Sequence, residues 1–589
     1  MLELILGRAG SGKTALVMER IRERVLSEIP GSLLIVPEQY SHEAERELCR
    51  VCGDSLSLYA EVLSFSRFAS RVADSYGGRS GKTLDKGGKL LCMALALDSL
   101  GPSLRVFASA RRRPELQRSL LDTVEELKTA CADPAALRNA ALQTGKSFGD
   151  KLCDLALVME GYEAAVLRSG GDPTDPLERL SETLRSRSLG EGKQVYIDGF
   201  TDFTGLEKRV IEALLCAGAA VTVCLTVDEK LEGEMFEPSI RTVFALRRMA
   251  QELGVSVREE TVTSDAREKS PELRFLEGHM FAFSGDKLEG ESAAVRLFTA
   301  ENAAEECALA AATALYLARE NGARWHDIAV AVRGYEDYRD ELESAFARYG
   351  VPLYSSRRAN ILQKPLPALI FSAFETIQGG WRYDDIMGCL KTGLFGLNTE
   401  ECDALSGYAY LWSLHGSAWT SGRDWSLHPG GYGQPETEES REALRLLNAL
   451  RRRVSEPLCH LAERGRQAQS AREQLCALAD FFDEIGLAET LEARAKQLQA
   501  LGMDSLAAEY VQLWDITVDA MEQCDAVLGE QTLTQEEFAG LFRVLLSQYD
   551  VGTIPVSLDS VIAGDYDSAD DAKLLEALQS FQDQVTSAK

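Results

Sequence analysis

The fold is decided by Leu2-Glu3-Leu4-Ile5-Leu6-Gly7-Arg8-Ala9-Gly10-Ser11-Gly12-Lys13-Thr14, a short apolar run followed by eight residues rich in glycine. The last eight residues match the phosphate-loop pattern G-x-x-x-x-G-K-[ST]. Residues 14–25, which follow, carry the apolar spacing of a helix. A strand, a glycine-rich loop and a helix in this order predict a nucleotide-binding unit. The alternative is a chance glycine-rich turn, and the flanking strand and helix count against it.

The chemistry of a phosphate loop assigns a role to each residue type in this stretch. Glycines such as Gly10 and Gly12 let backbone N–H groups converge on phosphate oxygens, and the helix N-terminus adds the positive end of its dipole. Lys13 is expected to contact the β- and γ-phosphates, and the Thr14 hydroxyl to bind magnesium. Gly7, Arg8, Ala9 and Ser11 complete the loop. The predicted ligands are therefore ATP and Mg²⁺.

Outward from the loop, strands and helices alternate. Further apolar strands are expected at residues 33–36, 62–66, 194–200 and 220–225, with helices at 41–51 and 206–217. This alternation is typical of a parallel sheet with helices on its faces. Residues 83–188 contain only amphipathic helical patterns, and residues 228–290 are charged and poor in strands. The sequence predicts a first α/β domain of residues 1–82 and 189–290, with residues 83–188 as a helical insertion.

A second α/β set follows. Strands are expected at residues 294–299, 327–332, 351–354 and 559–565, and helices at 302–320 and 335–349. The intervening residues 366–555 are helical, apart from a loop rich in Gly, Trp and His. We expect residues 291–365 and 556–575 to form a second, incomplete α/β domain, residues 366–555 a second helical insertion, and residues 576–589 an acidic tail.

Composition limits the possible functions. The formal net charge of −29 argues against non-specific binding of nucleic acid by the surface as a whole, although a basic channel within it stays open. Neither an apolar run of about 18 residues nor a signal peptide is evident, so a cytoplasmic protein with no membrane span is expected. Most of the 13 cysteines fit helical cores. The pair Cys49 and Cys52 leaves a metal or redox role open as an alternative to core packing.

An acidic partner for magnesium is expected at the end of a neighbouring buried strand. Asp198 follows Val195-Tyr196-Ile197 and fits this position, with a simple turn-capping role as the alternative. An efficient helicase-type ATPase would place a glutamate next, but position 199 is Gly199. Asp202 and Glu207 are nearby acids without the expected spacing. The sequence therefore favours nucleotide binding over vigorous hydrolysis.

Several further segments carry a resemblance to a known family. They are Ile35-Val36-Pro37-Glu38-Gln39-Tyr40-Ser41, Val62-Leu63-Ser64-Phe65-Ser66-Arg67-Phe68, Tyr196-Ile197-Asp198-Gly199-Phe200-Thr201-Asp202-Phe203-Thr204, Ala329-Val330-Ala331-Val332-Arg333 and Tyr349-Gly350-Val351-Pro352-Leu353-Tyr354. Together with the phosphate loop, this ordered set resembles the AddB subunit of the bacterial AddAB helicase–nuclease, a relative of superfamily 1 helicases. The resemblance implies that both α/β domains are RecA-like P-loop domains, the second incomplete.

The resemblance also implies roles by position. The loops at 37–41 and 64–68 would face single-stranded DNA, and the residues expected to bind it are Gln39, Tyr40, Ser64, Phe65 and Arg67. Phe65 and Phe68 could stack on bases, with core packing as the alternative. Arg333 would lie against the γ-phosphate across the cleft, with a strand-end surface arginine as the alternative, and Arg358 is a weaker candidate. The catalytic set is thus Lys13, Asp198 and Arg333, with Thr14 and Asp198 as magnesium ligands.

The function implied is that of an AddB-type subunit, which joins an AddA-type helicase–nuclease in a heterodimer that repairs DNA double-strand breaks by homologous recombination. It would bind ATP-Mg, single-stranded DNA and duplex ends, with weak or no ATPase of its own, so it would be an enzyme only within the complex. The family's nuclease motif and terminal cysteine cluster are not found in this sequence, so neither nuclease activity nor an iron–sulfur cluster is expected in this chain. A stand-alone P-loop phosphotransferase and a non-catalytic P-loop scaffold remain alternatives.

Overall fold

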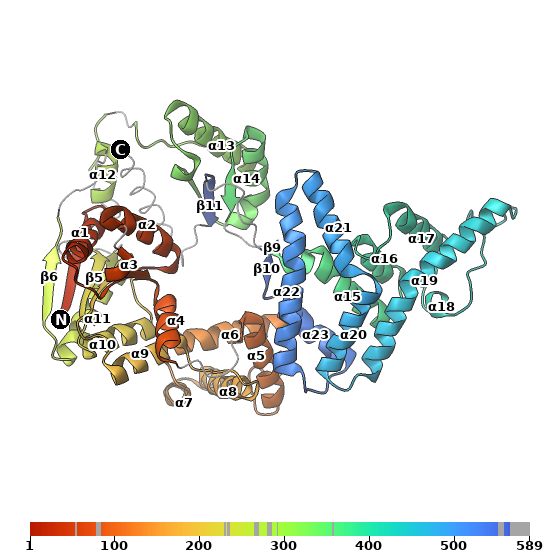
Figure 1. The fold of residues 1–589 in the computed structure, drawn as a ribbon, viewed down its shortest axis with the longest axis horizontal. Coiled ribbons are helices and arrows are strands. Elements are labelled where there is room, and N and C mark those ends of the chain that lie inside the picture. Colours follow the sequence, from red (N-terminus) through yellow and green to blue (C-terminus); the bar gives the residue numbers. More distant parts are fainter. Residues whose placement is uncertain are drawn as a thin grey trace.

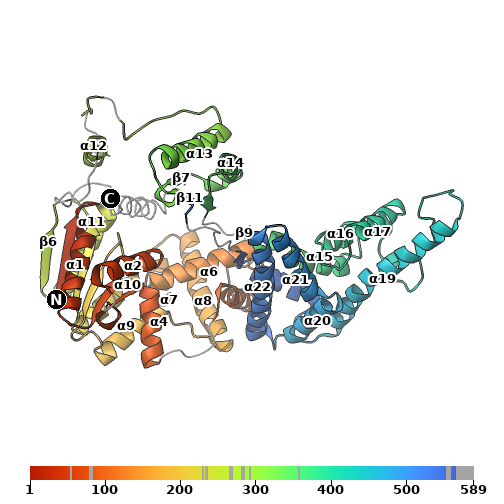
Figure 2. The same cartoon turned by 45° about the horizontal axis from the view of Figure 1, so that its top comes forward.

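The computed structural model describes residues 1–53, 56–77, 84–228, 231, 236–263, 270–279, 286–290, 293–355, 359–551 and 559–565. Two α/β regions lie beside one large helical region (Figure 1). In Figures 1 and 2 the second α/β region lies between the first one and helices α21 (Leu487–Ala500) and α22 (Asp504–Leu528). None of the described helices combines the length and apolarity that a bilayer-spanning segment requires.

The first α/β region is built on a parallel sheet of six strands in the order β3-β2-β4-β5-β1-β6. The strands are β1 (Leu2–Gly7), β2 (Ser32–Ile35), β3 (Ala60–Leu63), β4 (Gln194–Ile197), β5 (Ala220–Thr226) and β6 (Val257–Thr261). All six residues of β1 are buried. A parallel sheet that is covered on both faces requires such continuous apolar runs. The sequence therefore predicts the strand before the phosphate loop.

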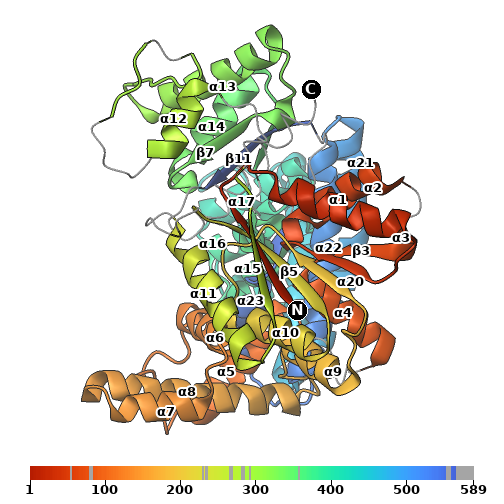
Figure 3. The same ribbon diagram turned by 90° about the vertical axis from the view of Figure 1, so that its left-hand side faces the viewer.

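Helices cover both faces of this sheet (Figure 3). One face packs on α1 (Lys13–Leu26) and α2 (Ser41–Cys52), and its core includes Ile5, Val17 and Ile21. The other face packs on α4 (Phe65–Tyr76), α9 (Pro176–Arg187), α10 (Gly205–Cys216) and α11 (Glu237–Glu252). Because alternate strand residues point to opposite faces, Leu4 joins the second core while its neighbour Ile5 joins the first.

The helical region combines two segments that are far apart in the sequence. The first comprises α5 (Lys86–Leu100), α6 (Pro114–Thr129), α7 (Pro134–Leu142) and α8 (Lys146–Arg168). The second comprises α15 (Pro365–Gln378), α16 (Tyr383–Lys391), α17 (Thr399–Leu411), α18 (Ser417–Thr420), α19 (Glu438–Gln467), α20 (Ala471–Glu484), α21, α22 and α23 (Gln535–Leu546). Their buried side chains form one hydrophobic cluster, which includes Leu91 on α5 and Leu545 on α23. The Tyr549 hydroxyl donates to the Asp85 carboxylate across this junction. The two segments expected as separate insertions therefore share a core.

The second α/β region contains a parallel sheet of three strands in the order β7-β11-β8. They are β7 (Ala329–Val332), β8 (Leu353–Ser355) and β11 (Val561–Asp565), with helices α13 (Ala303–Glu320) and α14 (Tyr335–Tyr349). Phe346 on α14 is fully buried in the small core of this region. Two short strands, β9 (Ala359–Asn360) and β10 (Asp550–Val551), pair antiparallel where this region meets the helices.

The structure corrects two predictions about strands. Residues 294–299 form no strand, and Leu297 there is 94 % exposed, so its apolar pattern finds neither a partner strand nor a core. Conversely, β6 lies within residues 228–290, which the sequence indicated to be poor in strands, and it was not predicted. It is an edge strand rich in charge, whose Glu259 and Glu260 pair with Arg247 and Arg20. Ion pairs replace apolar burial in β6, so no hydrophobic pattern reveals it. Arg358 and the expected acidic tail 576–589 lie outside the described residues.

Candidate nucleotide and DNA site

The phosphate loop connects β1 to α1 and has the backbone that its glycines permit. Gly10 has φ +76° and Gly12, the residue before α1, has φ +94°, both in the left-handed region that favours glycine. A Cβ atom at Gly7 would lie 2.5 Å from the carbonyl oxygen of Val262, so only glycine fits there. The Ser11 N–H donates to the Arg8 carbonyl at 3.2 Å. The loop thus holds its backbone at the N-terminus of α1, as a phosphate-binding loop requires.

Lys13 folds back over the loop. Its side chain is largely buried, and its Nζ donates to the carbonyl oxygens of Gly7 and Arg8, both at 2.9 Å. These carbonyls solvate the ammonium group at the mouth of the loop. Phosphate oxygens can replace such neutral acceptors, because an ammonium group is attracted more strongly to an anionic oxygen than to a neutral carbonyl oxygen.

Thr14 and Asp198 meet at the end of the sheet. The Thr14 hydroxyl on α1 donates to Asp198 Oδ2 at 2.7 Å, and the Gly199 N–H donates to Asp198 Oδ1 at 2.9 Å. A hydroxyl next to a carboxylate is a donor set that suits Mg²⁺, which prefers oxygen ligands. Behind them lies the thiol of Cys224 on β5, and burial raises its pKa well above its usual value, so the thiol stays neutral. The residues present therefore fit magnesium.

An ion pair that the sequence did not indicate anchors the loop. Arg8 Nε lies 2.9 Å from Asp228 Oδ1, and Arg8 NH1 donates to the Glu277 carbonyl at 3.3 Å. Asp228 follows β5, the strand paired with β1, and Glu277 lies on α12 (Pro271–His279). The signal available in the sequence was a pair of opposite charges, each just beyond the end of an expected strand. Parallel strands bring such residues to the same edge of the sheet.

The acids near Gly199 are both engaged in local structure. Asp202 accepts from Lys208 Nζ at 3.0 Å and from the Thr242 hydroxyl at 2.9 Å. Burial alone would raise the pKa of Asp202, but these hydrogen bonds and that from the Phe203 N–H lower it below its ordinary value. Glu207 completes a capping box with Thr204 at the start of α10. Each carboxylate thus uses one of its oxygens to hold local structure together.

The residues expected to face DNA divide into exposed and buried ones. Arg67 is exposed on α4, whereas Ser64 is buried and caps that helix by accepting from the Arg67 N–H at 3.2 Å. Phe65 is only 4 % exposed, and its ring packs edge-on to Phe200 and Phe203, with centroids 5.5 and 6.3 Å away. In this structure its position is that of a core residue. A base could stack on Phe65 only after this packing opened.

The other residues that the sequence predicts to face DNA lie in the short helix η1 (Glu38–Tyr40). Tyr40 is half-buried against the core beneath α1, and the side chain of Gln39 lies outside the described residues. Glu38, for which the sequence indicated no role, joins the two loops. Its Oε2 accepts from the hydroxyls of Ser64, at 2.6 Å, and Ser66. Arg67 Nε lies 3.3 Å from its Oε1.

The remaining predicted residues lie apart from the loop. Arg333 directly follows β7 in the second sheet and is exposed, and among the described residues no hydrogen bond or ion pair joins it to the phosphate loop. Cys49 and Cys52 lie on α2, and burial raises the pKa of the Cys52 thiol. The described residues contain no group of three or more His, Cys, Asp or Glu side chains that could hold a metal ion, so a metal role for these cysteines gains no support.

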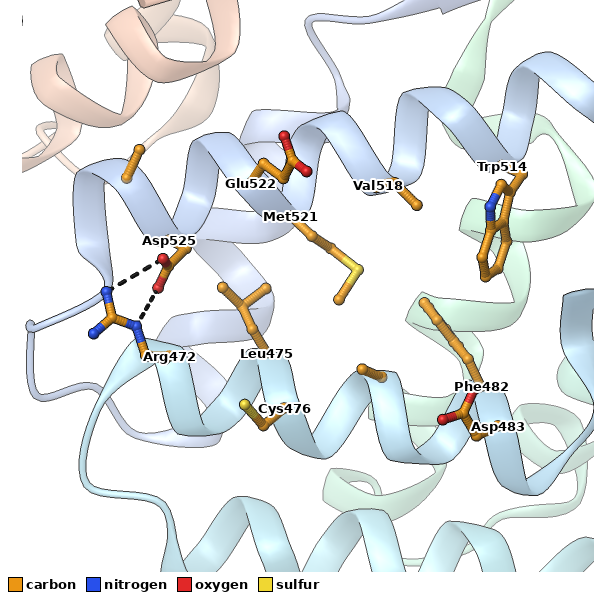
Figure 4. Close-up of a pocket in the computed structure, with 12 residues that line it drawn as sticks. Arg472, Leu475, Cys476, Phe482, Asp483, Trp514, Val518, Met521, Glu522 and Asp525 are labelled. Carbon is orange, nitrogen blue, oxygen red and sulfur yellow. Dashed lines mark hydrogen bonds and ion pairs between the residues drawn. The ribbon is translucent and has the colours of Figure 1, made fainter. Parts of the chain in front are cut away.

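An apolar groove of about 650 Å³ lies between α20 and α22 (Figure 4). Its apolar lining includes Leu475, Phe482, Trp514, Val518 and Met521, and the ion pair between Arg472 and Asp525 lies at one end. No residue predicted from the sequence lies there. Helices of the second helical segment form this groove, whereas the candidate site lies on the six-stranded sheet.

Comparison with known proteins identifies the family. The family model described as "ADDB, N-terminal" matches residues 4–277. Among similar curated proteins are the B subunits of the ATP-dependent helicase/deoxyribonucleases of Acetivibrio thermocellus, 31% identical over 96% of this chain and 50% of the relative, and of Moorella thermoacetica, 33% identical over 98% and 52%. That of Desulforudis audaxviator is 32% identical over 96% and 50%. The chain spans about half the length of these relatives. These matches, together with the phosphate loop and the six-stranded parallel sheet, assign residues 4–277 to the AddB N-terminal family, and the chain as a whole is similar to the AddB subunits named above.

Proposed function

We propose that this chain acts as the AddB-type subunit of a cytoplasmic helicase–exonuclease that repairs DNA double-strand breaks by homologous recombination. It binds ATP-Mg and single-stranded DNA, and its ATPase is weak or absent. Its partner is an AddA-type helicase–nuclease subunit, and the complex acts at duplex ends. The names of the relatives, each the B subunit of an ATP-dependent helicase/deoxyribonuclease, support this role.

The observation that carries the proposal is the hydrogen bond from the Thr14 hydroxyl to Asp198 Oδ2, 2.7 Å long, beside the phosphate loop. Two residues 184 positions apart meet where a nucleotide-bound magnesium ion would need oxygen ligands. In the proposed site the loop N–H groups and Lys13 hold the phosphates, while Thr14 and Asp198 hold the ion. The ion, when bound, neutralises charge on the β- and γ-phosphates.

Weak hydrolysis follows from the residues around Gly199. Activation of a water requires a carboxylate near the γ-phosphate, and position 199, where a helicase-type ATPase would have a glutamate, is a glycine. Asp202 and Glu207 each commit one oxygen to structural hydrogen bonds, Asp202 with Lys208 and Glu207 with Thr204. We assign both α/β regions to the RecA-like class, with residues 83–188 and 366–555 as helical insertions. Arg333 then supplies the γ-phosphate contact from the second region. In the alternative of a non-catalytic scaffold, the phosphate loop binds no nucleotide. Nucleotide binding therefore distinguishes the two functions.

Isothermal titration of the full chain with Mg-ATP and Mg-ADP tests nucleotide binding. We expect saturable binding that Lys13→Ala abolishes, because the variant lacks the charge at the loop mouth. Lys151→Ala is the matched control, since it removes an exposed lysine of α8, remote in the fold from the loop. Absence of binding by the parent chain would leave the scaffold alternative and end this proposal.

Single-stranded DNA binding is tested by fluorescence anisotropy with a labelled oligothymidylate over a series of KCl concentrations. Contacts to phosphates predict affinity that falls steeply as salt rises, with a slope of about −0.7 per phosphate neutralised. A phosphotransferase would instead transfer phosphate from ATP to a nucleoside monophosphate and ignore the oligonucleotide. The isolated chain is also expected to leave DNA intact in the presence of Mg²⁺. Robust metal-dependent degradation of DNA would refute the prediction that this chain has no nuclease activity.

A further inference from the structure

The carboxylate of Glu38 is the meeting point of the two loops proposed to face DNA. It comes from η1, whereas its donors Ser64, Ser66 and Arg67 come from the start of α4. The Ser64 hydroxyl donates at 2.6 Å, the Ser66 hydroxyl donates to the same oxygen, and Arg67 Nε lies 3.3 Å from the other oxygen. One anion thus occupies two hydroxyls and a guanidinium.

These donors are of the kind that protein–DNA interfaces direct at phosphate oxygens. The side chains of Glu38 and Arg67 are 60% and 55% exposed, so solvent and a DNA strand can reach them. The hydroxyls of Ser64 and Ser66 lower the pKa of Glu38, with a smaller contribution from Arg67, so the carboxylate is ionised at neutral pH. An ionised Glu38 neutralises Arg67 and repels a phosphate at the same place.

We propose that Glu38 is an internal competitor of the DNA backbone, which holds the exposed donors Ser66 and Arg67 until a phosphate displaces it. The buried Ser64 hydroxyl keeps the carboxylate in this position. The inference rests on the proposed binding of single-stranded DNA and adds the residue that sets its strength. A carboxylate in this position lowers the affinity for every sequence alike. It therefore favours weak, readily broken contacts, which suit a protein that a partner moves along a strand.

A second ion pair, between an arginine of the same helix and a glutamate of β3, provides a matched control. Arg71 NH2 lies 2.7 Å from Glu61 Oε1, and both side chains are exposed to a similar degree as those of Glu38 and Arg67. Glu61 lies on β3 and has no hydroxyl partner in the described structure. Replacing Glu61 changes the net charge by the same amount as replacing Glu38. Any difference between the two variants therefore reports position and not overall charge.

The test compares Glu38→Gln with Glu61→Gln in the full chain, by anisotropy with a labelled 20-residue oligothymidylate from 50 to 300 mM KCl. We expect Glu38→Gln to bind about tenfold more tightly at low salt, with a slope steeper by about 0.7, because one more phosphate is neutralised. Glu61→Gln should change the affinity less than twofold. Equal affinities for the two variants would overturn the inference, as would weaker binding by Glu38→Gln with unchanged thermal stability.

A double-mutant cycle separates competition from a purely structural role. Arg67→Ala alone should weaken binding by less than about threefold, because Glu38 already neutralises Arg67, but in the Glu38→Gln background it should remove most of the gain. Glu38→Ala should reproduce the gain, which guards against a specific effect of the amide. Additive effects in the cycle would overturn the inference. Failure of the parent and all variants to bind oligonucleotide would instead refute the proposed DNA binding itself.

Discussion

The two parallel sheets among the described residues differ most in how completely helices cover them. In the six-stranded sheet, β1 is buried along its whole length, and helices pack on both faces. In the three-stranded sheet, β7 alternates between exposed and half-buried residues. A loop that must hold its backbone around a phosphate requires a rigid support, and buried parallel strands supply one. The candidate site accordingly lies on the first sheet, and only Arg333 is expected from the second.

The largest expected effect comes from equal substitutions in the two sheets. Leu4→Ala in β1 should destabilise the first region by about 3 kcal/mol, because Leu4 is fully buried and its removal leaves a cavity. Leu353→Ala in β8, where the side chain is half-buried, should cost about 1 kcal/mol. Hydrogen exchange at increasing urea concentrations, followed in peptides from each sheet, measures both. Similar losses of protection in the two sheets would contradict the difference in coverage.

A smaller effect tests the junction between the two helical segments. A Cβ atom at Gly87 on α5 would lie 2.3 Å from Leu545 Cδ1 on α23, so Gly87→Ala should destabilise the helical region by about 2 kcal/mol through overpacking. Gly540→Ala on α23 is the control, since a Cβ atom there meets nothing within 4 Å. It should stabilise by about 0.5–1 kcal/mol through helix propensity. Thermal unfolding of the two variants should therefore shift in opposite directions.

The sequence was most informative where one residue type has only one physical explanation. The glycines of the phosphate loop, Lys13 and the apolar β1 predicted the strand, loop and helix that the structure contains. The contact between Thr14 and Asp198 was also implied, since both were expected to serve one magnesium ion. Continuous apolar runs and glycines are local signals, so they can be interpreted without knowledge of the rest of the fold.

Long-range packing was beyond the reach of the sequence. No local sequence pattern indicates that α5 packs on α23. The pattern of an amphipathic helix shows that one face is buried, but it does not show which element covers that face. The charged β6 was missed, since ion pairs cover it in place of apolar contacts. Phe65 is ambiguous for a related reason. The sequence pattern of an aromatic residue at helical spacing is the same whether the residue packs in a core or stacks on a base. The structure shows that Phe65 is buried.

A third prediction concerns position 199, where an efficient helicase-type ATPase would have a glutamate. Gly199→Glu should cost about 1–2 kcal/mol, because the backbone there has φ +82° and a Cβ atom would lie 3.1 Å from Pro37 Cδ. The strained carboxylate should not raise the ATPase rate measured by phosphate release. Gly199→Ala is the control for backbone strain alone, and it should show a similar loss in thermal stability. A glutamate variant with strong ATPase would show that the site lacks only its base.

The smallest expected effect concerns the only predicted catalytic group that lies on the second sheet. If Arg333 reaches the γ-phosphate, Arg333→Ala should weaken Mg-ATP binding about fivefold, or about 1 kcal/mol, since an exposed guanidinium works against water and salt. Mg-ADP, which lacks that phosphate, should bind as before. Arg348→Ala on α14 removes an exposed arginine from the same region and should change neither affinity. Equal losses for ATP and ADP would mean that Arg333 acts on the fold and not on the γ-phosphate. Unchanged binding of both would confine the nucleotide site to the well-covered first sheet.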